Sequence, residues 1–163
     1  MSLIIEPLGK QHDRAAFSCG IAELDAYLQR RAGQDVRRRI ARVFVCTEGG
    51  SAIVSGFYTL SALSIDVSAL PEDQARKLPR HPVPAALIGR LAVDRSAQGQ
   101  GLGRLLLADA VQRTLRASEQ VAIHALVVDA KSESACRFYA AHGFLSLPDQ
   151  PMRLFLPLKS VPG

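Results

Sequence analysis

Three glycines at alternate positions mark a segment that is suited to hold phosphate. The segment Arg95–Arg104 has the sequence RSAQGQGLGR and lies between a predicted buried strand and a predicted helix. Glycines at this spacing let the backbone approach a ligand closely and turn its N–H groups inward. The helix that follows adds its free N–H groups and the positive end of its dipole. We therefore predict a pyrophosphate site, although the segment is neither a Walker loop nor a dinucleotide fingerprint.

Tyr139, within Ser134–Phe144 (SACRFYAAHGF), is the candidate proton donor. A phenol with a pKa near 10 stays protonated at neutral pH and can protonate a leaving group. A tyrosine on an amphipathic helix is by itself more often a core residue. The role of proton donor therefore depends on the motif around it.

The cysteines and histidines do not predict a metal site. The three cysteines share no CxxC or other ligand spacing. A free cysteine such as Cys136 is more often a small buried apolar residue than a nucleophile. His124 and His142 have no acid or cysteine at ligand spacing, so we predict structural roles for both.

Two motifs occur in order, about 35 residues apart, and together they are more specific than either alone. Gln98-x-x-Gly101-x-Gly103 resembles the acetyl-CoA signature of the GNAT superfamily of N-acetyltransferases. The segment from Ala135 to Phe144 is similar to the A-x-x-F-Y-x-x-x-G-F pattern of the same superfamily. The chain is therefore identified as a member of that superfamily.

A narrower resemblance covers nearly the whole chain. The segments that carry it are FSCG (17–20), LDAYL (24–28), the Pro-rich loop at 79–84, GRLAVD (89–94) and LFLP (154–157). In these segments the chain resembles the TacT-like toxins of bacterial toxin–antitoxin modules. The resemblance implies an enzyme that acetylates the α-amino group of aminoacyl-tRNA and stalls translation. It also implies a ribbon-helix-helix antitoxin, binding to operator DNA only through the antitoxin complex, and a homodimer.

The same resemblance implies where the co-substrate acetyl-CoA lies. Tyr139 is the implied catalytic residue. The implied cofactor contacts are Leu91, Ala92 and Val93 for the pantetheine arm, Gln98, Gly99, Gln100, Gly101, Leu102, Gly103 and Arg104 for the pyrophosphate, and Ser132, Cys136 and Phe138 from the following helix. Arg104 would add charge to the backbone N–H groups.

The predicted central strand, Ala85–Val93, contains no carboxylate to act as a general base. Many members of the superfamily use one to deprotonate an ammonium of high pKa. An α-amine has a pKa of about 7.7–8.0 and costs roughly 1 kcal/mol to deprotonate at pH 7, against about 4–5 kcal/mol for lysine. The absence therefore suits an aminoacyl acceptor, although a water or Glu133 remains an alternative base.

The net charge of +5 is concentrated in two basic stretches, which indicates a polyanionic partner. Residues 29–42 hold six arginines against one acid, and residues 76–90 hold four basic residues and no acid. The predicted tRNA-binding residues are Arg30, Arg31, Arg37, Arg38, Arg39, Arg76, Lys77, Arg80 and Arg90. Arginines that merely solvate a helix or contact an acidic antitoxin remain the alternative.

The elements that must position these residues form an α/β pattern. We predict strands at 3–5, 43–45, 53–58, 85–93, 121–128, 144–147 and 152–158. We predict helices at about 21–28, in a pattern that Gly33 then interrupts, at 67–78, at 102–117, where Asp109 interrupts the apolar sector, and at 131–142. We expect one GNAT domain over residues 1–163, with a mostly antiparallel mixed sheet flanked by helices. Splayed central strands would form the acetyl-CoA cleft.

The sequence also indicates a cellular location and leaves two alternative functions open. No apolar run can cross a bilayer and the N-terminus lacks a secretion signal, so we expect a reduced, cytoplasmic setting without membrane contact. One alternative is an acetyltransferase for a small amine or a protein N-terminus. The other is a binding module that has lost catalysis, although Gln98, Gly101, Gly103 and Tyr139 are all present.

Overall fold

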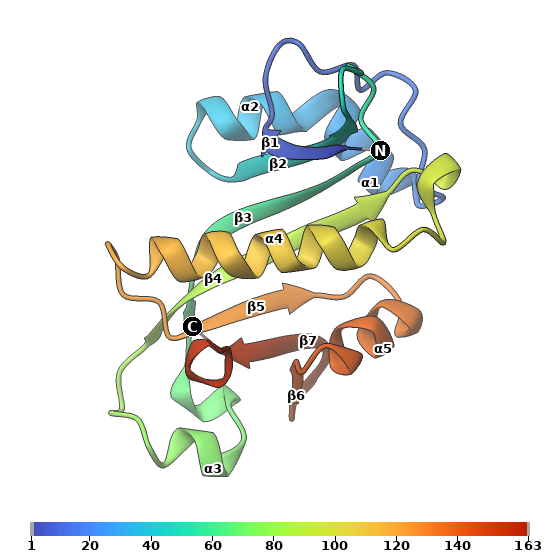
Figure 1. Cartoon of the computed structure of the whole chain (residues 1–163). Coiled ribbons are helices and arrows are strands. Elements are labelled where there is room, and N and C mark those ends of the chain that lie inside the picture. Colours follow the sequence, from blue (N-terminus) through green and yellow to red (C-terminus); the bar gives the residue numbers. More distant parts are fainter. Residues whose placement is uncertain (1, 163) are drawn as a thin grey trace. The chain divides into compact units, whose positions relative to one another are not determined.

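The computed structural model describes residues 2–162, which form a mixed α/β fold (Figure 1). In chain order the elements are β1 (Leu3–Pro7), α1 (Ala22–Ala26), α2 (Ala32–Arg37), β2 (Arg42–Glu48), β3 (Gly56–Ile65), α3 (Glu72–Ala75), β4 (Val83–Val93), α4 (Leu102–Ala117), β5 (Ala125–Asp129), α5 (Glu133–Ala141), β6 (Leu145–Leu147) and β7 (Gln150–Pro157). The strand order is β1-β2-β3-β4-β5-β7-β6. The pairs β1–β2, β2–β3, β5–β7 and β7–β6 are antiparallel, and β4–β5 is parallel.

The predicted mixed, mostly antiparallel sheet with flanking helices is therefore confirmed. The chain separates into two compact units. The first unit comprises Met1–Ser61 and Gly89–Gln112, and the second comprises Ala62–Ile88 and Arg113–Gly163. The single domain over 1–163 and the cleft between splayed strands stay predictions.

A continuous helical segment covers the core of the first unit. Leu24, Tyr27, Leu28 and Ala32 are buried at spacings of three or four residues, which places them on one face. They pack with Phe57 of β3. A π-helical turn, Tyr27–Arg31, joins α1 to α2. The expected interruption at Gly33 is wrong, because helix continues through it with Ala32 fully buried beside it.

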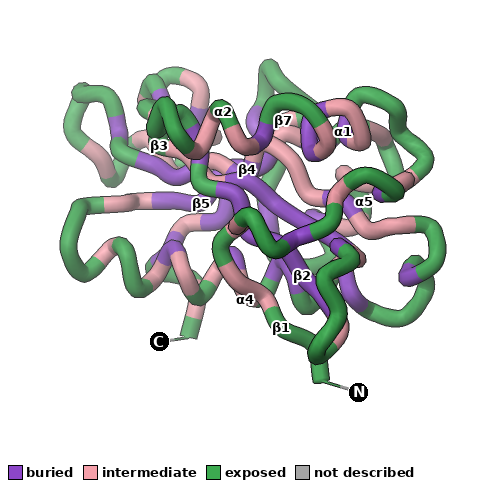
Figure 2. Tube along the Cα trace, turned by 90° about the horizontal axis from the view of Figure 1, so that it is seen from above, coloured by how far each residue is buried: buried purple, intermediate pink, exposed green. Residues whose placement is uncertain are grey.

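The second unit is built around β5, whose neighbours β4 and β7 cover both of its edges. Ala85–Ile88 of β4 pairs with Ala125–Val128, and β7 pairs with β5 from the other side. All four residues Ala125–Val128 are fully buried, as parallel-sheet strands require. Figure 2 shows buried stretches along β2, β4 and β5, while most loops are exposed.

The structure corrects three element boundaries. The helix predicted at 67–78 is a 3₁₀ turn, Val67–Ala69, followed by the one-turn α3 after Pro71. Proline there prevents a continuous helix because it lacks the N–H that a helix interior needs. The loop predicted up to residue 84 ends earlier, since β4 begins at Val83. β5 begins at Ala125 rather than Val121, and Val121 is 69% exposed.

One further boundary differs. β3 begins at Gly56 and extends to Ile65, whereas the sequence predicted a strand at 53–58. Helix α4 has the predicted bounds 102–117, and the hydroxyl of Tyr58 donates a hydrogen bond to the carboxylate of Asp109, which interrupts its apolar sector. A polar residue on that sector is therefore satisfied within the helix. Within residues 2–162, no helix is both long enough and apolar enough to cross a membrane.

Candidate acetyl-CoA turn and proton donor

The Gly-rich turn of the first unit has the geometry of an anion cradle. Gly99 and Gly101 have φ angles of +79° and +82°, a conformation that L side chains rarely adopt. A Cβ added at either position would meet no atom within 4 Å, so open space lies over the backbone there. The first hydrogen bond of helix α4 joins Leu105 N to Gly101 O at 3.2 Å.

The backbone amide groups of this turn indicate the class of ligand that it can bind. Within the described residues, the N–H groups from Gly99 to Arg104 have no protein acceptor. Unpaired N–H groups at a helix N-terminus bind anions, and Arg104 is exposed beside them. A pyrophosphate therefore fits the residues present.

Side chains that sequence analysis missed hold the turn in place. The Asp94 carboxylate accepts hydrogen bonds from Ser96 N at 3.1 Å, from Ser96 Oγ at 2.6 Å and from Ser18 N at 2.8 Å. Burial opposes ionisation, but these bonds and the charge of Arg95 together lower the pKa of Asp94. The Asp-x-Ser spacing is a local signal for such a turn. The contact with Ser18 has no signal in the sequence.

Gln98 links the turn to the predicted pantetheine strand. Its side-chain amide donates to the carbonyl of Val93 and to that of Cys19, both at 2.9 Å. Its side chain and its backbone N–H, which donates to Arg95 O at 3.4 Å, are thus both used within the protein. Leu91 and Val93 are half-buried and Ala92 is buried. The first unit therefore brings together the predicted residues 91–93 and 98–104.

The other predicted cofactor contacts and Tyr139 lie in the second unit, on or next to α5. Ser132 is the N-cap of this helix, and its hydroxyl accepts a hydrogen bond from Ala135 N at 3.1 Å. Cys136 is half-buried, with its Sγ 3.5 Å from the Sδ of Met152. Phe138 is half-buried and contacts the Tyr139 ring edge-on, with 5.2 Å between centroids.

Tyr139 is 4% exposed, and burial raises the pKa of its hydroxyl. Within residues 2–162 the hydroxyl has no hydrogen-bond partner. Phe144 also contacts its ring edge-on at 5.6 Å, so the ring is held from two sides. The side chain thus has a fixed ring and an uncommitted hydroxyl.

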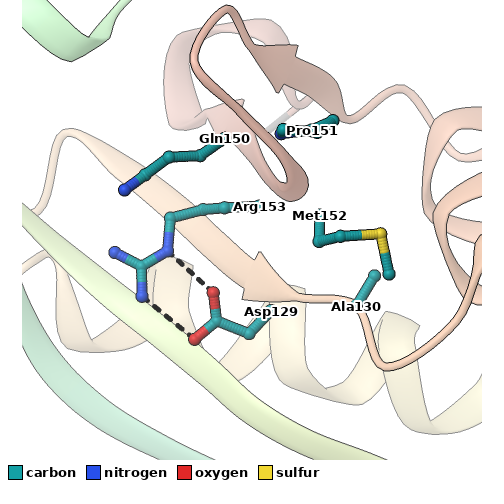
Figure 3. Close-up of a pocket in the computed structure, with 6 residues that line it drawn as sticks. All are labelled: Asp129, Ala130, Gln150, Pro151, Met152 and Arg153. Atoms are coloured by element: carbon teal, nitrogen blue, oxygen red, sulfur yellow. Dashed lines mark hydrogen bonds and ion pairs between the residues drawn. The ribbon is translucent and has the colours of Figure 1, made fainter.

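The second unit also contains a pocket of about 420 Å³, which the sequence did not indicate. It is lined by Asp129, Ala130, Gln150, Pro151, Met152 and Arg153. Arg153 makes a bidentate pair with Asp129, with Nε–Oδ1 at 2.7 Å and Nη2–Oδ2 at 3.0 Å (Figure 3). Hydrogen bonding to Asp129 raises the pKa of Arg153. The Met152 side chain points away from this pair, toward Ala130.

The predicted basic residues divide between the two units. Arg30, Arg31, Arg37, Arg38 and Arg39 are exposed in the first unit, and Arg76, Lys77 and Arg80 are exposed in the second. Arg90, in the first unit, is half-buried. Contact with RNA stays a prediction for all nine.

The histidines of the second unit make local contacts. The Nδ1 atom of His142 lies 2.8 Å from the carbonyl oxygen of Phe138, at the end of α5. Burial and the charge of Lys159 lower the pKa of His124. Among the described residues, no group of three or more histidines, cysteines or acids is arranged to hold a metal ion.

Comparisons with known proteins identify the family. An acetyltransferase (GNAT) domain model matches residues 39–145. A probable toxin TacT from Sinorhizobium fredii is 36% identical over 167 residues, covering 97% of this chain and 92% of the relative. A tRNA-acetylating toxin from Mycobacterium tuberculosis is 37% identical over 147 residues, covering 90% and 87% respectively.

Solved structures of toxins share the fold along the whole chain. AtaT complexed with acetyl-methionyl-tRNAfMet superposes with a TM-score of 0.91 at 35% identity, covering 98% of this chain and 96% of that one. A tyrosine-to-phenylalanine variant of AtaT, bound to the C-terminus of the antitoxin AtaR and acetyl-CoA, has a TM-score of 0.83 at 32% identity, covering 97% and 94%. With the domain match and these relatives, the chain belongs to the GNAT acetyltransferase family.

Proposed function

We propose that this chain is a toxin that transfers the acetyl group of acetyl-CoA to the α-amino group of an aminoacyl-tRNA and thereby stops translation. The observation that carries the proposal is the fold shared along 98% of the chain with AtaT in complex with acetyl-methionyl-tRNAfMet. The turn at Gly99–Arg104 supports a pyrophosphate-containing co-substrate. The excess of basic residues supports a nucleic-acid acceptor.

Acetyl-CoA supplies the acetyl group as a thioester, and this chain's residues bind it and handle one proton. The N–H groups of Gly99–Arg104 hold the pyrophosphate, and Leu91–Val93 lies along the pantetheine. In the overall transfer a C–N bond forms and the C–S bond breaks. One proton leaves the amine nitrogen and one arrives at sulfur, so the reaction needs no other reactant.

Tyr139 delivers the proton to sulfur. Its raised pKa keeps the hydroxyl protonated, but full transfer to a thiolate of ordinary pKa, near 8.5, is uphill. The transfer therefore accompanies C–S cleavage, and the proton released from nitrogen restores the phenol. An uncommitted hydroxyl on a fixed ring is suited to this role, because no internal bond must break first.

The absence of a carboxylate from Ala85–Val93 fits an acceptor amine of low pKa. An α-amine next to an ester is largely neutral near pH 8 and needs no strong base. Asp129 on β5 is engaged with Arg153 through both oxygens, so it is not poised as a base. We infer that water takes the amine proton and passes it to the Tyr139 oxygen, which restores the phenol.

The biological setting follows from the same proposal. A toxin of this kind needs an antitoxin, and AtaT has been solved bound to the C-terminus of its antitoxin AtaR. We infer that a ribbon-helix-helix antitoxin neutralises this chain and that the complex binds operator DNA. The toxin acts as a homodimer in the cytoplasm, where charged tRNA is found.

The test is to incubate the protein with labelled acetyl-CoA and total charged tRNA. Mild alkaline hydrolysis of the RNA then releases the amino acids for identification. We expect labelled N-acetyl amino acids, with no label in deacylated tRNA treated in parallel. Label in added polyamines or protein N-termini, with none in the RNA fraction, would favour the alternative acceptors. No transfer to any amine would indicate a binding module.

A further inference from the structure

Two arginines of the first unit, Arg31 and Arg90, lie against the ring of one buried tyrosine, Tyr27. The guanidinium carbon of Arg90 is 3.5 Å from the ring centroid, and that of Arg31 is 5.5 Å from it. The two carbons are therefore no more than about 9 Å apart, the sum of the two distances. Tyr27 itself is 1% exposed, so a rigid core residue gathers two cations at the surface.

Contacts on every side fix this tyrosine. Its hydroxyl donates to Asp35 Oδ2 at 2.8 Å, and its ring stacks on Phe57 at 6.3 Å between centroids. The backbone N–H of Arg90 donates to Thr59 Oγ1 at 3.1 Å. The π-helical turn Tyr27–Arg31 carries the second arginine, and such turns occur frequently at functional sites. Both guanidinium groups are thus positioned before any ligand arrives.

Among residues 2–162, neither guanidinium has an anionic partner. Within the described residues, Arg31 and Arg90 donate no side-chain hydrogen bond and form no ion pair, and the nearby Asp35 is bonded to Tyr27. Arg153, in contrast, is paired with Asp129 through two hydrogen bonds. A guanidinium stacked on a ring keeps its in-plane N–H groups available. Two like charges this close repel each other, and a bound anion would remove that repulsion.

We propose that Arg31 and Arg90 form a clamp that binds one phosphodiester group of the RNA substrate, with Tyr27 and Asp35 as positioning residues. This inference rests on the proposed function. A phosphate whose oxygens accept N–H bonds of about 2.7–2.9 Å from both sides can span two guanidinium groups whose carbons are no more than about 9 Å apart. Arg90 directly precedes Leu91–Val93, and three residues of strand cover about 10 Å. The phosphate bound is therefore one close to the aminoacylated end.

The test compares two small substrates that differ in one charge. Both are 3′-aminoacyl esters of the dinucleotide CpA, one with its natural phosphodiester and one with an uncharged methylphosphonate. For the unmodified protein we expect kcat/KM to be about ten-fold or more higher with the phosphodiester, the scale of hydrogen bonds to a charged group. Arg31→Lys and Arg90→Lys should each reduce this ratio, and the double variant should bring it near one.

Control variants separate the clamp from general charge and from stability. Arg116→Lys, an exposed arginine at the end of α4, should keep the full ratio. Tyr27→Phe keeps the ring but loses the bond to Asp35. It should lower the ratio only partially, because the ring that both guanidinium groups contact is still present. Thermal unfolding of every variant checks that it is folded.

Three outcomes would overturn the clamp. The first is a ratio of one in the unmodified protein, which leaves the proposed function intact because both substrates are acetylated. The second is a full ratio in the folded double lysine variant. The third is the same full ratio together with a loss, in the double lysine variant, of the binding that the unmodified protein shows to a poly-glutamate peptide. That result would assign the two arginines to an acidic protein partner. If the unmodified protein acetylates neither dinucleotide nor aminoacyl-tRNA, the proposed function fails and the clamp fails with it.

Discussion

At the scale of single residues, the three tyrosines of this chain use their hydroxyls differently. The Tyr27 hydroxyl donates to Asp35 and the Tyr58 hydroxyl donates to Asp109, so both are structural hydrogen-bond donors. All three rings are buried, yet within residues 2–162 the Tyr139 hydroxyl has no partner. An unpaired hydroxyl contributes little to folding, and this contrast supports a chemical role for Tyr139.

We expect Tyr139→Phe to lower kcat by roughly 10²- to 10⁴-fold, because only the proton donor is lost. The acetyl-CoA Kd and the Tm should stay unchanged, since no hydrogen bond breaks. Tyr58→Phe is the matched control: it should lower the Tm through the lost bond to Asp109 but keep kcat. Steady-state kinetics and thermal unfolding measure both. Near-normal turnover in Tyr139→Phe would assign the proton donor to another group.

The pH dependence of the reaction distinguishes the acceptor amine from the donor. Burial raises the pKa of Tyr139, so this hydroxyl stays protonated through pH 9. The α-amine must be neutral, so kcat/KM should rise about ten-fold per pH unit below its pKa and level off above it. A profile from pH 6 to 9 tests this. A lysine-like acceptor would give a continued rise to pH 9, and a decline above pH 7 would require a donor of lower pKa.

At the scale of elements, Gly101 of the Gly-rich turn and Gly50 of the connection between β2 and β3 are matched positions for substitution. Gly101 and Gly50 both have φ of +82° and open space where a Cβ would lie. Valine at either position therefore imposes similar backbone strain. We expect both variants to lower the Tm to a similar extent, but only Gly101→Val to raise the acetyl-CoA Kd, by ten-fold or more. Calorimetry that gives equal Kd values for the two would remove the turn from the cofactor site.

Local sequence signals predicted the elements of the site, and tertiary contacts determined the rest. Glycine spacing and a following apolar helix were sufficient to predict the turn, because both signals lie within one short segment of the sequence. The contact between Ser18 and Asp94 joins residues 76 positions apart, and no local pattern encodes it. Asp109 interrupts the apolar sector of the predicted helix, and its partner Tyr58 lies on a distant strand, so no local pattern encodes this contact either.

At the scale of the whole molecule, the excess of positive charge is the property to test. Reversing Arg37, Arg38 and Arg39 to Glu should weaken tRNA binding and make the binding constant less dependent on salt. For a phosphate-binding surface, the logarithm of the binding constant falls with the logarithm of the salt concentration, with a slope of about −0.7 to −0.9 per phosphate contact. The acetyl-CoA Kd should not change. A control reversing the exposed residues Lys10, Arg116 and Lys159 makes the same change in net charge. Equal effects of both triple variants would mean that net charge alone acts.

The contacts that fasten Ser18 and Cys19 to the Gly-rich turn have a consequence for dynamics. Ser18 donates to Asp94, its carbonyl accepts from Arg95 N at 2.8 Å, and Cys19 O accepts from Gln98. The two segments must therefore open together, as one cooperative unit. Acetyl-CoA should slow hydrogen–deuterium exchange of the Ser18 and Cys19 amides as well as those of the turn. Mass spectrometry of peptides spanning residues 15–24 can thus report on cofactor binding from the opening segment of the chain.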